Sequence, residues 1–91
     1  PEPRKAVQRR QQLKKYGLTE FEYAELLITQ NGVCAICAKP GMRQNLGVDH
    51  DHYSGRVRGL LCENCNIAIG LFKDDSQLLF KAIDYLRRES I

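Results

Sequence analysis

The sequence has no apolar run that approaches the roughly 18 residues needed to span a bilayer. It also has no internal repeat, no low-complexity block and no linker rich in Pro, Gly or Ser. The first residues, Pro1 to Lys5, are polar, and no apolar stretch with a small-residue cleavage site follows them, so we recognise no secretory signal. These absences argue against a membrane protein and favour one small domain in the reducing cytoplasm.

Charge is unevenly distributed along the 91 residues. Residues 1–15 contain six basic side chains and only one acidic one, whereas the remainder is slightly acidic. Such a basic arm is suited to neutralise phosphates and to bind nucleic acid without regard to sequence. A solvated helical face or a flexible tail explains the same charge run equally well. The basic residues of the arm are Arg4, Lys5, Arg9, Arg10, Lys14 and Lys15.

Helical patterns precede a central region that is rich in turns. Residues 6–15 favour a helix that Gly17 ends, and Thr19 with Glu22 has the form of a capping box at the start of a second helix. Asn31-Gly32 supplies a left-handed stop for that helix. The apolar positions that we expect on its packed face are Phe21, Ala24, Leu27 and Ile28.

The central region predicts a β-hairpin. Residues 46–52 and 56–61 look like two short strands joined through Tyr53-Ser54-Gly55. If Ser54-Gly55 is a two-residue turn, the register follows from it. The pairs that this register places opposite one another are His52 with Val57, Asp51 with Arg58, and His50 with Gly59. Asp49 and His50 then lie on opposite faces of the strand, and they serve one site only if the chain bulges there.

Two helices are expected after the hairpin. Residues 63–71 read as a short helix, and Asp74 and Asp75 are both suited to cap a last helix. The apolar residues that repeat at helical spacing in this last helix are Leu79, Ala82, Ile83 and Leu86.

All four cysteines fall into two Cys-x-x-Cys pairs, Cys34 with Cys37 and Cys62 with Cys65. Four thiolates at such spacings close a tetrahedral shell around zinc and leave no open position for catalysis. We therefore expect a structural zinc site that couples metal binding to folding. Disulfides or a redox pair are the alternatives that the spacing leaves open.

Both histidines of the chain lie within the segment Asp49-His50-Asp51-His52. Carboxylate oxygens suit a hard ion such as Mg²⁺ or Mn²⁺, whereas thiolates suit zinc, so two metals with different roles are compatible. Imidazole titrates near neutral pH and is suited to take a proton from water. The segment therefore predicts a hydrolytic metal site, and the alternative is a polar hairpin held by salt bridges.

Several strings together resemble one known family. They are Tyr16-Gly17-Leu18-Thr19, the first Cys-x-x-Cys pair, Val48-Asp49-His50-Asp51-His52, and the run from Gly55 through Val57-Arg58-Gly59-Leu60-Leu61-Cys62 to Cys65-Asn66. This combination is similar to the recombination endonuclease VII family of HNH, or His-Me finger, nucleases. The resemblance implies an α+β fold, a small zinc-stapled ββα-metal domain with flanking helices over residues 16–91, preceded by the basic arm.

The resemblance also implies roles for individual residues. His50 becomes the general base, Asp49 and Asn66 become ligands of one catalytic divalent ion, Mg²⁺ or Mn²⁺, and His52 is a weaker candidate for contacting the scissile phosphate. Such an ion neutralises the phosphate and stabilises the leaving oxygen. Asn66 as a helix-capping residue is the alternative. Three residues later the chain has Ile69, where the junction-resolving member of the family has a carboxylate.

Two classes of function compete on this sequence. The first is a phage-type DNA endonuclease of the host cytoplasm that nicks or cuts duplex or branched DNA. The second is a non-catalytic zinc module that binds nucleic acid. DNA is the expected partner and a membrane is not, whereas site preference, the physiological ion and a homodimer are left open. Further DNA contacts are expected from Arg43, Arg56 and Arg58.

Overall fold

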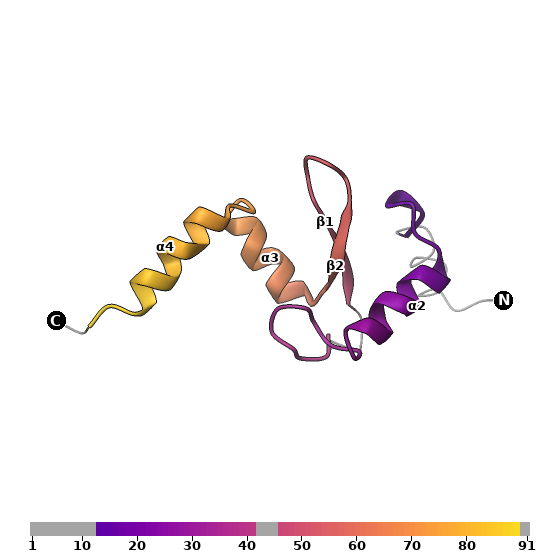
Figure 1. The fold of residues 1–91 in the computed structure, drawn as a ribbon, viewed down its shortest axis with the longest axis horizontal. Coiled ribbons are helices and arrows are strands. Elements are labelled where there is room, and N and C mark those ends of the chain that lie inside the picture. The colour runs from indigo at the N-terminus through magenta and orange to yellow at the C-terminus, as the bar shows by residue number, and fades with distance from the viewer. Residues whose placement is uncertain (1–12, 42–45, 90–91) are drawn as a thin grey trace.

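The computed structural model describes residues 13–41 and 46–89. In chain order its elements are α2 (Glu20–Thr29), β1 (Gly47–His50), β2 (Val57–Leu61), α3 (Glu63–Leu71) and α4 (Ser76–Leu86). The hairpin of β1 and β2 stands between α2 and α3, and α4 lies beyond α3 (Figure 1). From the second predicted helix onward, the order of helices and strands is the predicted one, whereas most of the helix predicted over residues 6–15 lies outside the described residues. Within these residues, no helix combines the length and the apolar character that crossing a membrane requires.

Helix α2 begins and ends where the sequence predicts. The Glu22 amide donates to the Thr19 hydroxyl over 3.1 Å, and the Thr19 amide donates to the Glu22 carboxylate over 3.0 Å. These two bonds complete the predicted capping box. At the other end Asn31 and Gly32 have φ angles of 57° and 73°. Both residues therefore adopt the left-handed conformation that stops a helix.

Of the positions predicted for the packed face of α2, only Leu27 lies against the core. Phe21 and Ile28 are 73% and 76% exposed, and Ala24 is also exposed. The buried face instead contains Tyr23, whose hydroxyl donates to the backbone just before β1. Leu26 and Leu27 continue this stripe toward the core. Because each of these positions fits a helical repeat equally well, periodicity alone selected the wrong side.

The hairpin is antiparallel, as predicted, but its register is not the predicted one. The observed partners are Gly47 with Leu61, Val48 with Leu60, Asp49 with Gly59 and His50 with Val57. A β-bulge separates the last two pairs, and Arg58 is the extra residue. The predicted pairs of Asp51 with Arg58 and of His50 with Gly59 are therefore wrong.

The turn of the hairpin explains the change of register. The Asp51 amide donates to the carbonyl of Arg56, and the Gly55 amide donates to the carbonyl of Asp51, both over 2.8 Å. The connection therefore spans residues 52–55 instead of two residues. The Asp51 carboxylate accepts from the amides of Tyr53 and Ser54, and these bonds, that of Ser54 above all, hold the pKa of Asp51 below its usual value. Asp51 thus organises the turn and does not pair with Arg58.

Gln30, the C-cap residue of α2, connects this helix to β2. Its amide nitrogen donates to the carbonyls of Val33 and Leu60, each over 2.9 Å. Its amide oxygen accepts from the Leu60 amide over 2.8 Å. A Cβ atom at Gly59 would lie 3.0 Å from this amide oxygen, so glycine is needed for the close approach. The side chain of one residue thereby takes the place of a neighbouring strand.

A small core lies under the hairpin and beside the first cysteine loop. The Ala35 amide donates to the carbonyl of Leu60 over 3.1 Å, which ties this loop to β2. Because Cys34 is itself only 1% exposed, the core and the cysteine cluster are continuous. The buried members of the core are Leu13, Tyr23, Cys34, Leu46, Val48, Leu60 and Leu61.

The two C-terminal helices start at specific caps. Cys62 is the N-cap of α3, and its sulfur accepts from the Cys65 amide over 3.4 Å. Asp75 is the N-cap of α4. Asp74 takes no part in this cap, because Lys73 and Asp74 both have left-handed φ angles and the Asp74 carboxylate contacts the hairpin instead. Only one of the two predicted capping residues is therefore used.

Candidate functional site

The four cysteine sulfurs gather into one cluster, in which all lie within 4.8 Å of one another. The Sγ atoms of Cys37 and Cys62 are 3.8 Å apart, far beyond a disulfide bond of about 2.05 Å. A tetrahedral site with Zn–S bonds of about 2.3 Å places its sulfurs about 3.8 Å apart. The predicted pairing of two Cys-x-x-Cys loops around one point is thus confirmed, and the cluster fits zinc.

The acidities of the thiols differ within the cluster. Burial opposes ionisation of Cys34, but hydrogen bonds from the amides of Cys37, Cys62 and Ile36 outweigh it and lower the pKa of Cys34 to about 6. Burial, followed by hydrogen bonds shared with the other thiols, raises the pKa of Cys65 to about 12. A first thiolate in the cluster disfavours a second one. A divalent cation relieves this repulsion, which is the electrostatic reason for assigning a metal to the cluster.

Charged and aromatic side chains form a second group, the Asp49 cluster, which consists of Asp49, His50, His52, Arg58 and Asp74. The Arg58 guanidinium donates to both carboxylate oxygens of Asp49, over 2.7 and 3.0 Å. The same guanidinium donates to Asp74 over 2.9 Å. These carboxylates, Asp49 above all, hold the pKa of Arg58 above its usual value. The Nε2 atom of His52 lies 3.4 Å from the Asp74 oxygen that Arg58 contacts.

The ring of His50 contacts two other rings, one inside this cluster and one outside it. The centre of its ring is 4.7 Å from that of Tyr16 and 4.9 Å from that of His52. The register shift between Asp49 and His50 arises from the extra residue Arg58 on the partner strand β2. Asp49 is only 9% exposed, and His50 is half-buried. A buried carboxylate and a half-buried imidazole therefore occupy successive positions at the end of β1.

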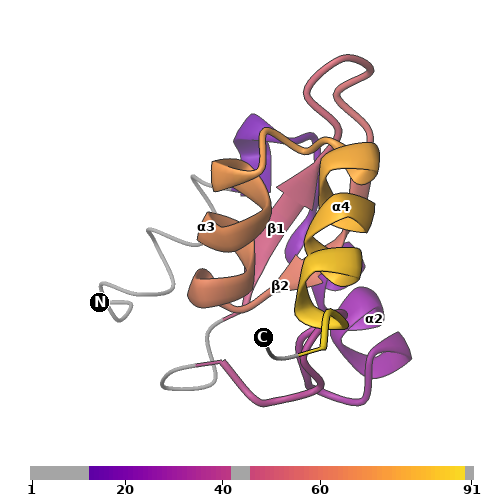
Figure 2. The same ribbon diagram turned by 90° about the vertical axis from the view of Figure 1, so that its left-hand side faces the viewer.

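Asn66 lies in the first turn of α3, and its side chain is exposed. Helix α3 packs on β1, and Figure 2 shows both α3 and α4 in front of the hairpin. The backbone amide of Asn66 donates to the carbonyl of Cys62, as expected within a helix. In the part of the chain that the structure describes, no hydrogen bond joins the Asn66 side chain to Asp49 or His50.

The predicted DNA-contacting residues are spread over several places. Lys14, Lys15 and Arg56 are exposed. Arg58 is engaged with Asp49 and Asp74, so it is not a free surface cation. Those that lie outside the described residues are Arg4, Lys5, Arg9, Arg10 and Arg43.

Sequence reasoning missed two members of this region, Asp74 and Tyr16. Asp74 was expected to cap α4 together with Asp75. One carboxylate is sufficient for that cap. The presence of a second acidic residue beside it was therefore the signal that Asp74 has another role. Tyr16 was noted only as part of a family string, and no periodicity connects it with His50.

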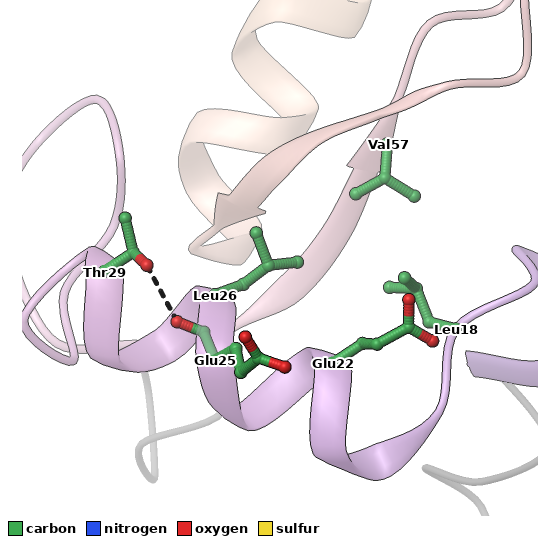
Figure 3. A pocket seen from close by; sticks show the side chains of 6 residues that line it. All are labelled: Leu18, Glu22, Glu25, Leu26, Thr29 and Val57. Atoms are coloured by element: carbon green, nitrogen blue, oxygen red, sulfur yellow. Dashed lines mark hydrogen bonds between the residues drawn. The ribbon is translucent and has the colours of Figure 1, made fainter.

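A separate open hollow of about 360 Å³ lies between α2 and β2. Figure 3 shows the carboxylates of Glu22 and Glu25 beside it, with Val57 reaching in from the hairpin. None of the Asp49 cluster lines this hollow, and its acidic side chains disfavour a phosphate group. The residues that line it are Leu18, Glu22, Glu25, Leu26, Thr29 and Val57.

The fold and the two clusters define a small α+β protein in which a thiol cage braces a hairpin that carries carboxylates and histidines. The sequence model of recombination endonuclease VII matches residues 9–88, so the chain belongs to the recombination endonuclease VII family. It is 47% identical over 78 residues to the Gene 59 protein of Mycobacterium phage D29, with 84% of this chain and 47% of that protein covered. The Gene 59 protein of Mycobacterium phage L5 is 43% identical over 76 residues, with 81% and 46% covered. The chain therefore spans less than half the length of these curated relatives.

Proposed function

We propose that this chain is a metal-dependent DNA endonuclease, which hydrolyses phosphodiester bonds with a histidine base and one divalent ion in an HNH, or His-Me finger, site. Membership of the recombination endonuclease VII family supports the proposed class of reaction, which is phosphodiester hydrolysis. The hairpin supports the location, because it carries the buried carboxylate of Asp49, bonded to Arg58, directly before the half-buried imidazole of His50. In this ββα-metal arrangement, the hairpin and α3 supply the catalytic side chains over residues 16–91.

His50 is the general base in this proposal. Its ring is held between the rings of Tyr16 and His52. Among the described residues no carboxylate is hydrogen-bonded to His50, so a ring nitrogen is free to take a proton from an attacking water. His52 is more open, with its side chain 65% exposed, and Asp74 holds one of its nitrogens. This placement suits contact with the scissile phosphate.

Asp49 and Asn66 are the proposed ligands of the catalytic ion. Each carboxylate oxygen of Asp49 accepts one hydrogen bond from Arg58, and each retains a further lone pair for a cation. The amide of Asn66 is exposed at the start of the helix that packs on β1. Such oxygen donors suit Mg²⁺ or Mn²⁺. When bound, the ion supplies charge neutralisation at the phosphate and at the leaving oxygen.

DNA is the proposed substrate and partner, in the cytoplasm of a phage-infected host. The basic arm of residues 1–15, with exposed Arg56, would contact phosphates without reading bases. Duplex and branched DNA are both candidate substrates. A homodimer is compatible with the exposed apolar side chains of α4, in which Phe80 and Leu86 are 66% and 80% exposed.

The decisive experiment compares the parent chain with His50→Ala and His50→Gln in a supercoiled-plasmid nicking assay. We expect the parent to cut with Mg²⁺ or Mn²⁺, and both variants to be slower by about 100-fold or more, since neither side chain can act as a base. Zinc content and melting temperature should stay at parental values, which shows that the fold is intact. Cutting by His50→Ala at the parental rate would show that the base is another group.

The same assay distinguishes the proposed endonuclease from the alternative function, a non-catalytic zinc module that binds nucleic acid. A parent chain that binds DNA with full zinc content, yet cuts neither linear, branched nor supercoiled DNA with any divalent ion, would establish it.

A further inference from the structure

We propose that Asp74 is a positioning residue of the nuclease site. By sharing the Arg58 guanidinium with Asp49, it leaves a net negative charge on the group of three side chains and holds the Asp49 carboxylate in one direction for a divalent cation. The inference rests on the proposed function, and it adds a residue from the turn between α3 and α4 to a site otherwise built from the hairpin and α3.

The backbone delivers Asp74 to the hairpin in an uncommon conformation. Lys73 and Asp74 have φ angles of 57° and 55°, which are disfavoured for residues other than glycine. Their amides close the turn by donating to the carbonyls of Gly70 and Ile69, both over 2.9 Å. The Asp74 carboxylate has no role in this turn, and Asp75 alone caps α4. The side chain of Asp74 therefore acts outside its own turn.

The carboxylate of Asp74 sets the net charge of the group that it forms with Asp49 and Arg58. Arg58 lies between the two carboxylates, at 2.7 Å from Asp49 and 2.9 Å from Asp74. Two carboxylates and one guanidinium leave one net negative charge for a cation. Without the charge of Asp74, Asp49 and Arg58 would form a neutral pair, which attracts a cation less strongly than the net negative group does.

Asp74 also contacts two side chains, Arg58 and His52, that are more exposed than its own. The Arg58 side chain is 38% exposed and the His52 side chain is 65% exposed, whereas that of Asp74 is only 16% exposed. A single oxygen of the half-buried Asp74 side chain therefore contacts two more exposed groups on the hairpin. A group that orients a metal-ligating carboxylate through a hydrogen-bonded partner commonly changes metal affinity by about 10- to 100-fold.

The test measures Mn²⁺ binding to zinc-loaded protein without DNA, from the electron paramagnetic resonance signal of free Mn²⁺. Asp74→Asn is compared with Asp75→Asn, which removes the neighbouring charge but keeps an N-cap. Asparagine also tolerates the left-handed φ of residue 74. We expect the dissociation constant for Mn²⁺ to rise about 10-fold in Asp74→Asn and to change less than about twofold in Asp75→Asn. In DNA cleavage, kcat should fall in Asp74→Asn while KM for DNA does not rise.

Each outcome bears on the proposal. Unchanged Mn²⁺ affinity in Asp74→Asn, or an equal loss in Asp75→Asn, would overturn the positioning role. If Asp74→Asn loses zinc or melts early, Asp74→Gly, which suits the left-handed backbone, is measured instead by the same criterion. A parent chain that neither binds Mn²⁺ nor cuts DNA overturns the proposed function itself. A parent that does both, with an unaffected Asp74 variant, overturns only this inference.

Discussion

The Gln30 amide pairs with three backbone groups that no neighbouring strand satisfies. Its contacts with Val33 and with both polar groups of Leu60 are all 2.9 Å or shorter. The Leu60 carbonyl has a second partner in the Ala35 amide, whereas the Leu60 amide relies on Gln30. A lost partner for a buried backbone group costs about 1–3 kcal/mol.

We therefore predict that Gln30→Ala lowers the free energy of unfolding by about 2 kcal/mol, because the Leu60 amide loses its acceptor in a buried place. Urea unfolding of the zinc-loaded protein measures this change. Gln77→Ala, on the exposed side of α4, is the matched control and should change stability by less than about 0.5 kcal/mol. A Gln30 variant as stable as this control would show that water replaces the amide.

The sequence predicts single residues well where their partners are close in the chain. The two cysteine pairs have the spacing of metal ligands, and this spacing alone predicts the cysteine cluster that the structure contains. Gln30 and Asp74 act on residues far along the chain, so no local pattern marks them. Their roles depend on how α2 and the α3–α4 turn are placed against the hairpin, which only the folded structure fixes.

Elements were predicted where a local hydrogen bond defines their ends. The capping box of α2 and the N-cap of α4 are formed within a few residues, and both lie where the sequence places them. The register of the hairpin depends on the Asp51 side chain, which enlarges the turn, and on the Arg58 bulge. A turn that is longer or shorter by one or two residues changes every cross-strand pair. The register was therefore the least predictable feature of the hairpin.

The basic arm of residues 1–15 overlaps the hydrophobic core at its C-terminal end. Leu13 is only 2% exposed and belongs to the core, so a deletion that tests the arm must end before it. We predict that removal of residues 1–12 weakens DNA binding and flattens its dependence on salt. Loss of phosphate contacts changes the slope of log K against log salt by about 0.9 for each contact. Fluorescence anisotropy titrations at several salt concentrations provide the slopes.

The matched control for this deletion is Lys81→Ala, which removes a positive charge from exposed α4. Its slope should stay close to that of the intact chain. An unchanged slope after removal of residues 1–12 would exclude the arm from the DNA-binding surface.

The whole molecule depends on the cysteine cluster for its shape. The hydrophobic core is small, and Cys34 is one of its buried members. The first cysteine loop is bonded to β2 through Ala35, while Cys62 and Cys65 join the end of β2 to the start of α3. A metal at this point therefore fixes the hairpin relative to α3. We therefore expect the position of the Asp49 cluster to depend on a metal bound by the four cysteines.

Removal of zinc should consequently unfold the domain. Structural zinc sites contribute about 10–16 kcal/mol at neutral pH, whereas whole domains are stable by only about 5–15 kcal/mol. We predict that a strong chelator under reducing conditions abolishes the cooperative melting transition in circular dichroism, and that zinc but not Mg²⁺ restores it. Omission of Mg²⁺ alone should stop DNA cleavage and leave the melting transition unchanged. A metal-free protein that melts like the zinc-loaded form would show that the core suffices without the cage, and the geometry of the Asp49 cluster would then have to arise from the bulge and Arg58 alone.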